Sequence, residues 1–210
     1  MAIPAEIAAL VYDRTQGDVD RVKEYKRRMM TGGLSALTAD EMTEYMAGMK
    51  GSYNYTDLNR VGEAVAVIAA EMVSVGTSLK AYKEENEVGD DPIFAPLDPD
   101  KVTVDPKTDW TMTDIPSKTQ MARYISDIST LYDNIPLPET TPLPPDTAEH
   151  LTWEKANAIE KILWDIWEAI PTVDAEQRSL VDGLVKNRIY PRGNWYQYTG
   201  FYAGEFQFKE

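Results

Sequence analysis

Cysteine is absent from this chain, and histidine occurs once, at position 150. Without cysteine the chain forms no disulfide and no thiolate metal site, and it needs no oxidising compartment. His150 has no second histidine or cysteine with which to complete a zinc site. No serine stands in a nucleophile-elbow glycine motif that would make His150 part of a catalytic triad. We therefore predict no metal, no cofactor and no catalytic residue, and we interpret His150 as a surface residue beside a helix cap.

Basic residues are fewer than acidic ones. The chain has 21 lysines and arginines and 35 aspartates and glutamates, which gives a formal net charge of -14 at pH 7. A polyanion is bound by basic residues clustered on one surface. The one dense basic cluster, at residues 26–28, lies beside acidic residues in an amphipathic segment, so nucleic acid is not an expected partner. The chain also has no long apolar run and no basic leader segment. We expect a soluble protein made in the cytoplasm, with no membrane association.

What the sequence does contain is an internal repeat. Residues 55–72 and 153–170 carry the same apolar pattern at an offset of 98 positions, as between Asn59 and Asn157 (157 minus 59). The apolar residues recur at steps of three and four, which places them on one face of a helix. Two long amphipathic helices are therefore predicted. Their matched residues are Leu58, Val61, Val65, Ile68 and Met72 in the first copy and Ala156, Ile159, Leu163, Ile166 and Ile170 in the second.

Asn59 and Asn157 border the apolar stripe in both copies. A buried amide must have hydrogen-bond partners, so each asparagine is a candidate structural clamp on a neighbouring backbone, such as an incoming connector. Simple exposure of both amides at the surface is the alternative.

Capping motifs predict where the helices begin. In such a motif the side chain of the first residue accepts a hydrogen bond from the backbone N–H three residues later, and the side chain of that later residue accepts one from the backbone N–H of the first. We expect Gly32 and Gly33 to end the first helix, Gly51 to end the second, and the first long helix to reach about residue 75 and continue, exposed and charged, over 78–87. Thr152 opens the second long helix, which we expect Pro171 to end before a short helix over 174–185. The other capping pairs are Thr15 with Asp18, Thr38 with Glu41, Asn54 with Asp57, and Ser117 with Gln120.

Proline-rich segments separate these helices. Residues 88–116 contain five prolines and little helical period, which predicts an extended acidic connector. Residues 135–145 are expected to adopt the polyproline-II conformation along the surface. The aromatic tail, broken by glycines, indicates a β-hairpin over 191–210.

The predicted fold is therefore mainly α. We expect a helical bundle built from two similar helical units joined by a proline-rich connector, with a small C-terminal β-hairpin. The corresponding divisions are a first helical unit at 1–87, the acidic connector at 88–116, a second helical unit at 117–190 and the aromatic β tail at 191–210.

Aromatic residues supply the candidate interface. Their rings offer a large amphipathic contact area, which suits docking to a protein or stacking on a glycan. Alternatively, one face of the hairpin covers the bundle, because a lone two-stranded hairpin is marginal without a surface to pack on. Trp164 and Trp167 are expected to fill the bundle centre or a subunit contact. The candidates in the tail are Trp195, Tyr196, Tyr198, Phe201 and Tyr202, together with Phe206 and Phe208.

Carboxylates gather in two places. Glu160, Asp165 and Glu168 on the second long helix could supply a paired-carboxylate site of the glycosidase kind. The connector aspartates could bind calcium, although the EF-hand spacing is lacking. Charged side chains on loops and helices are usually exposed to solvent. We therefore expect both groups of carboxylates to be solvated rather than to form a catalytic or calcium site. The connector residues are Asp90, Asp91, Asp98, Asp100, Asp105 and Asp109.

Five segments of the chain have a recognisable sequence. They are Asp13-Arg-Thr-Gln-Gly-Asp-Val-Asp-Arg-Val, Gly48-Met-Lys-Gly-Ser-Tyr-Asn-Tyr-Thr-Asp-Leu-Asn-Arg-Val, Asp109-Trp-Thr-Met-Thr-Asp-Ile-Pro, Met121-Ala-Arg-Tyr-Ile and Leu151-Thr-Trp-Glu-Lys-Ala-Asn-Ala-Ile-Glu-Lys-Ile-Leu. These segments resemble phage and prophage structural proteins of the tail or tail-fibre type, over most of residues 13–170. The resemblance implies a role in virion structure and carries over no catalytic residue. The chain contains no long glycine-rich or coiled-coil shaft, so a small adaptor, baseplate or fibre-attachment component is expected.

Three functional hypotheses follow. The leading one is a non-enzymatic virion component, made in the host cytoplasm and incorporated into the particle, which contacts other virion proteins and forms a homo-oligomer. The second is a carbohydrate-binding module that recognises a host cell-wall polymer through the aromatic tail. The third is an acid–base hydrolase that uses carboxylates near Glu160.

Overall fold

The computed structural model describes residues 2–88, 97–148 and 151–189. Within these residues the chain is mainly helical and contains no strand, which confirms the predicted mainly α class. The predicted β-hairpin lies outside the described residues. In chain order the elements are α1 Ala5–Ala8, α2 Gln16–Gly32, η1 Leu34–Ala36, α3 Ala39–Ala47, α4 Tyr55–Glu85, η3 Pro99–Lys101, α5 Lys118–Asp133 and α6 Trp153–Ile189.

The predicted capping motifs start the helices where they were expected. Thr15, Thr38, Asn54 and Ser117 each accept a hydrogen bond near the start of a helix and belong to a reciprocal capping box. Thr152 precedes α6 and its hydroxyl oxygen accepts the Lys155 N–H at 3.4 Å. α3 ends earlier than predicted, before Gly48 rather than at Gly51, because Gly48 adopts a φ of 90° that disfavours other residues.

Pro171 does not end the second long helix, contrary to the prediction. α6 continues through Pro171 to Ile189, so the separate helix expected over 174–185 is part of α6. An interior proline removes one helical hydrogen bond and crowds the preceding turn, at a cost of about 3 kcal/mol. Ile170 and Val173, on either side of it, are both buried in the main core. Their packing holds the helix together across the proline, which itself faces solvent.

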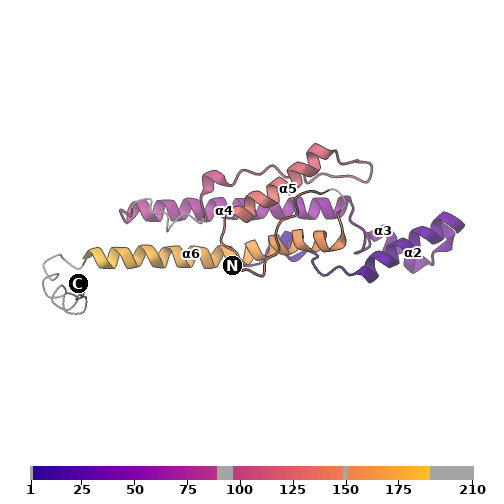
Figure 1. Ribbon diagram of the computed structural model, residues 1–210, viewed down its shortest axis with the longest axis horizontal. Coiled ribbons are helices and arrows are strands. Elements are labelled where there is room, and N and C mark those ends of the chain that lie inside the picture. The colour runs from indigo at the N-terminus through magenta and orange to yellow at the C-terminus, as the bar shows by residue number, and fades with distance from the viewer. Residues whose placement is uncertain (1, 89–96, 149–150, 190–210) are drawn as a thin grey trace, which may run out of the picture.

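α4 and α6 lie side by side and run in the same direction (Figure 1). Three side-chain pairs join them, and the two members of each pair are 100 positions apart. A constant offset along both helices requires a parallel arrangement in one fixed register. The pairs are Arg60 with Glu160, Ser78 with Arg178, and Tyr82 with Asp182.

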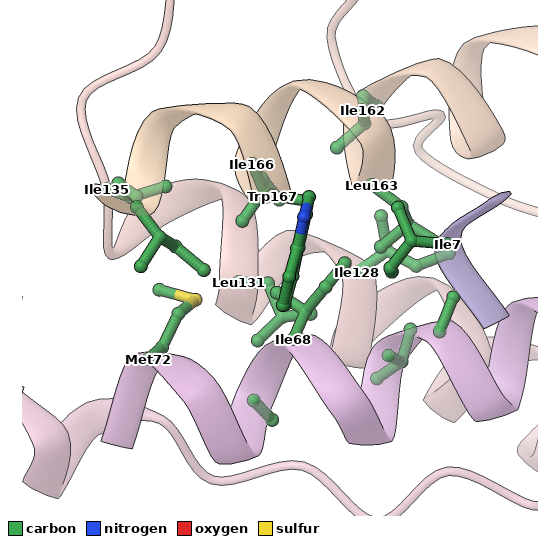
Figure 2. Close-up of a cluster of buried hydrophobic side chains, with 14 of the residues drawn as sticks. Ile7, Ile68, Met72, Ile128, Leu131, Ile135, Ile162, Leu163, Ile166 and Trp167 are labelled. Carbon is green, nitrogen blue, oxygen red and sulfur yellow. The ribbon is translucent and has the colours of Figure 1, made fainter. Parts of the chain in front are cut away.

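The main core forms where α5 packs against both long helices. Every residue of the two repeated apolar stripes is buried. Figure 2 shows Ile68 and Met72 of α4 facing Ile166 and Trp167 of α6, with Ile128 of α5 beside them. Burying one large apolar side chain contributes about 1.5–3 kcal/mol, so the paired stripes contribute substantially to stability.

The short helices α2 and α3 form an arm that extends beyond the ends of α4 and α6 (Figure 1). The arm has its own small core of Val22, Tyr25, Leu37 and Met49. Arg28 joins its two helices, because its guanidinium donates to the Glu41 carboxylate at 2.7 and 2.9 Å. We use the term arm for residues 16–49 below.

α4 has the length and apolar composition of a membrane-spanning helix, which the sequence analysis did not predict. Its apolar residues, including Val61, Val65 and Ile68, lie in the core against α5 and α6. Packing within the protein accounts for these positions, and 39% of the most apolar 18-residue window of α4 is buried.

Candidate functional site

The aromatic interface candidates Trp195, Tyr196, Tyr198, Phe201 and Tyr202 lie outside the described residues, as does His150. The glycan-binding hypothesis depends on those tail residues. Trp164 and Trp167 take different positions on α6. Trp167 is buried in the main core, whereas Trp164 is half-buried beside Tyr12, with their ring centroids 5.8 Å apart.

Asn59 and Asn157 each bind both main-chain groups of one distant residue. The Asn59 Nδ2 donates to the Trp110 carbonyl at 2.9 Å, and the Trp110 N–H donates to the Asn59 Oδ1 at 2.7 Å. In the same way, the Asn157 Nδ2 donates to the Arg14 carbonyl at 2.9 Å, and the Arg14 N–H donates to Oδ1 at 3.0 Å. Both amides thus fix an extended segment against a long helix, and we call the two arrangements the asparagine clamps.

Beside the Asn157 clamp lies a buried ionic cluster made of Arg14, Asp57, Arg60 and Glu160. The Glu160 carboxylate accepts from Arg14 at 2.6 Å, from Arg60 at 2.9 Å through each oxygen, and from the Val11 N–H at 2.6 Å. Asp57 accepts from Arg14 at 3.0 Å and also from Arg60. Two negative and two positive groups therefore balance where the N-terminal segment meets α4 and α6.

Burial makes the balance of this cluster important. The side chains of Glu160 and Arg14 are 0% and 2% exposed, so neither can be solvated by water. An unpaired charge at such a depth is costly, and removing one partner of a buried pair typically destabilises a protein by about 3–5 kcal/mol. Burial alone would lower the pKa of Arg60, but the hydrogen bonds and negative charge of Glu160 and Asp57 outweigh it and raise that pKa.

Two tyrosines close the cluster on another side. The guanidinium carbon of Arg14 lies 5.4 Å from the ring centroid of Tyr53, within the range of a cation–π contact. The hydroxyl groups of Tyr53 and Tyr124 are hydrogen-bonded to each other. Burial raises the pKa of both hydroxyls, and the charge of Glu160 adds to the effect. Both tyrosines therefore stay protonated and neutral at ordinary pH.

The carboxylates considered for acid–base chemistry have separate environments. Glu160 is enclosed by its arginine partners, and Asp165 accepts from the Thr141 hydroxyl at 2.9 Å and from Lys161. Glu168 is exposed. A glycosidase needs two carboxyl groups that flank a bound sugar, and an enclosed Glu160 cannot reach one. The geometry gives no support to hydrolysis at this position.

The connector aspartates that the structure describes serve as caps and ion-pair partners. Asp98 caps η3, Asp105 pairs with Arg123 at 2.6 Å, and Asp109 pairs with Lys107, which lowers the pKa of Asp109. Asp90 and Asp91 lie outside the described residues. No group of three or more potential metal ligands occurs within the described part of the chain.

The sequence analysis missed the ionic cluster. Asp57 was assigned to a helix cap, which it does form by accepting the Asn54 N–H at 2.8 Å, but it also pairs with both arginines. A signal was present at Glu160, which falls beside Ile159 on the apolar side of its helix. A charge at such a position requires a partner of opposite sign. In the first copy of the repeat, the position that corresponds to Glu160 is 62, and Arg60 is two residues from it.

Comparisons of the chain with models of protein families, with curated proteins and with solved structures found no match.

Proposed function

We propose that this chain is a non-enzymatic phage or prophage virion component, of the tail, baseplate or fibre-attachment kind, which acts through protein–protein contacts. One observation carries the proposal: the long parallel pair of α4 and α6 is fixed at one end by the buried ionic cluster, and the arm projects beyond that end. The sequence resemblance to phage structural proteins supports the same role.

The dimensions of the pair suit a rigid connecting element. α4 has 31 residues and α6 has 37, and at about 1.5 Å per residue they are about 46 and 55 Å long. Their register is held by pairs at both ends, from Arg60 with Glu160 to Tyr82 with Asp182. Such a pair sets a fixed length between the end that carries the arm and the far end of α6.

We further infer that the fold is a helical bundle made of two similar units. The repeated apolar stripes face each other across α4 and α6, and each long helix carries one asparagine clamp at the same position of the repeat. A bundle of this kind suits a scaffold protein. The geometry that the two units share would hold in place the segments that differ between them.

The arm is the contact surface that we favour. Met30 and Leu34, close together in sequence at its outer turn, are 89% and 63% exposed. Exposed large apolar side chains on a projecting element suit burial against another protein. The expected neighbours are other virion proteins and further copies of this chain.

Mass spectrometry of purified particles tests the proposal. Particles from the phage or lysogen that carries the gene should contain the chain, and the purified protein should form an oligomer by light scattering. Replacing Met30 and Leu34 together by aspartate should reduce incorporation, because a charge would be buried in the contact. Glu63→Gln, an exposed change on α4, is the matched control and should leave incorporation unchanged.

A strictly monomeric chain that is absent from the particles would overturn the proposed role. If the protein is present but the aspartate variant is incorporated as efficiently as the control, the arm is not the contact surface.

A further inference from the structure

A six-residue pattern, Asp-x-Thr-x-x-Asp, occurs at residues 13–18 and again at 109–114. The same hydrogen bond forms in both places, at the start of α2 in the first and in a turn in the second. The Thr15 N–H donates to the Asp18 carboxylate at 2.8 Å, and the Thr111 N–H donates to Asp114 at 2.7 Å. α5 begins at a separate capping box, formed by Ser117 with Gln120.

The second residue of each pattern is the one held by an asparagine clamp. Arg14 is held by Asn157 and Trp110 by Asn59, through the same two hydrogen bonds. The clamped residues are 96 positions apart (110 minus 14), and the asparagines are 98 apart (157 minus 59). Two elements that are matched in sequence thus make matched contacts.

The match extends one helical turn further along each long helix. Val11 is three residues before the clamped Arg14, and Glu160 is three residues after Asn157. The Val11 N–H donates a hydrogen bond to the Glu160 carboxylate. At the corresponding place in the other site, the Lys107 carbonyl lies against Gly62, and a Cβ at Gly62 would be 2.5 Å from that oxygen. In both sites the segment therefore runs antiparallel to the helix that holds it.

The two segments are exchanged between the halves of the chain. Residues 5–14 lead the first half, but their clamp is on α6 in the second half. Residues 97–110 lead the second half, but their clamp is on α4 in the first half. Exchange of an identical element between two copies is the arrangement found in segment-swapped dimers. The parallel, in-register pairing of α4 and α6 agrees with a two-fold axis along the pair.

We propose that the chain is a covalently joined pseudo-dimer in which each long helix carries a peptide-binding site for the Asp-x-Thr segment of the other half. This arrangement does not depend on the virion role proposed above. The ligand class of each site is an extended peptide that offers the N–H and the carbonyl of one residue to the asparagine.

The two sites have different preferences at the clamped residue. The α6 site takes arginine, because Glu160 of α6 pairs with Arg14 there, with Asp57 of α4 as a second partner. The α4 site has Gly62 at the position that matches Glu160, and a glycine cannot pair with a guanidinium group. The segment held there carries Trp110 at the clamped position, with the Lys107 Nζ of the same segment 4.9 Å from its ring centroid. The Arg14 segment therefore fits the α6 site better than the α4 site.

Hydrogen exchange of the full chain, followed by mass spectrometry, tests the exchange of segments. Asn59→Ala should accelerate exchange about tenfold in a peptide that contains Trp110 and leave a peptide that contains Arg14 unchanged. Asn157→Ala should do the reverse. The control is Ser74→Ala, an exposed change on α4. The proposal would be overturned if Asn59→Ala accelerated exchange only around Arg14, or if Asn157→Ala accelerated it only around Trp110.

A second measurement applies if either substitution loosens the whole molecule. A protease site inserted within residues 89–96 of the full chain allows the two halves to be cut apart after folding. The cut protein should elute as one particle in the absence of denaturant, because the core between α4 and α6 and both clamped segments cross from one piece to the other. Asn59→Ala in the N-terminal piece should still accelerate hydrogen exchange around Trp110 in the C-terminal piece. Separation of the pieces under native conditions would overturn the proposal.

Discussion

Arg60 and Glu160 join the two long helices through a paired contact in which the Arg60 Nε and Nη2 donate to the two carboxylate oxygens, each at 2.9 Å. The planar guanidinium group and the carboxylate match each other in this geometry, which fixes orientation as well as distance. Because Glu160 also binds Arg14 and the Val11 N–H, a single carboxylate sets the relative positions of three separate segments.

Replacing Glu160 by glutamine should destabilise the protein by about 3–5 kcal/mol, because Arg14 and Arg60 would then share one carboxylate in a buried site. The free energy of unfolding from urea denaturation measures this. Glu168→Gln is the matched control on the exposed side of the same helix and should change the value by less than about 0.5 kcal/mol. Equal small effects of the two substitutions would show that the cluster does not contribute to stability.

Replacing Gly62 by alanine should destabilise the protein by about 1–3 kcal/mol, since the added methyl group would displace the Lys107 carbonyl. Gly183 lies in α6 with nothing within 4 Å of an added Cβ, so it is the matched control. Gly183→Ala should stabilise the protein by up to about 1 kcal/mol, because alanine favours the helix. Thermal unfolding of both variants measures the difference. A Gly62→Ala protein as stable as the control would contradict the close approach of the connector to α4.

Glu41 should make the stability of the arm depend on pH. Its hydrogen bonds with Arg28, and then with the Thr38 N–H, lower its pKa from 4.5 to about 2. A carboxyl group with a lowered pKa in the folded state stabilises that state above its unfolded pKa, and the contribution is lost as pH falls. The arm should therefore weaken between about pH 4.5 and 2. A carbon NMR titration of the Glu41 carboxyl should show a midpoint near 2.

Arg28→Met is the informative variant for this titration, because it removes the main cause of the shift and keeps a long side chain. The Glu41 midpoint should rise toward 4.5 in the variant. An unchanged midpoint would mean that Arg28 does not hold Glu41 in solution.

The starts of the helices could be predicted because a capping box is local. Thr15 and Asp18, or Asn54 and Asp57, are three residues apart, and the sequence alone brings them together. The apolar stripes could also be predicted, since helical periodicity places them on one face whatever the partner is.

The remaining features depend on contacts between distant residues. Ile170 belongs to the predicted stripe, but no local pattern reveals that Val173, beyond Pro171, packs into the same core and holds the helix across the proline. Likewise, Arg14 and Glu160 are 146 positions apart, and their pairing follows only from the parallel arrangement of α4 and α6. Sequence equivalence pointed to Asn59 and Asn157 as a matched pair and to an incoming connector as a partner, but not to the individual residue that each one holds.

The parallel register of α4 and α6 is the claim on which the account most depends, and distances between paired spin labels test it directly. The chain has no native cysteine, so labels attach only at introduced ones. Labels at residues 56 and 154, and at residues 77 and 175, should both give short distances, because each pair lies within about two residues of the same height. Labels at residues 56 and 175 should be farther apart by about 30 Å along the axis. A short distance between 56 and 175, with long distances for the other two pairs, would show antiparallel helices and contradict the account.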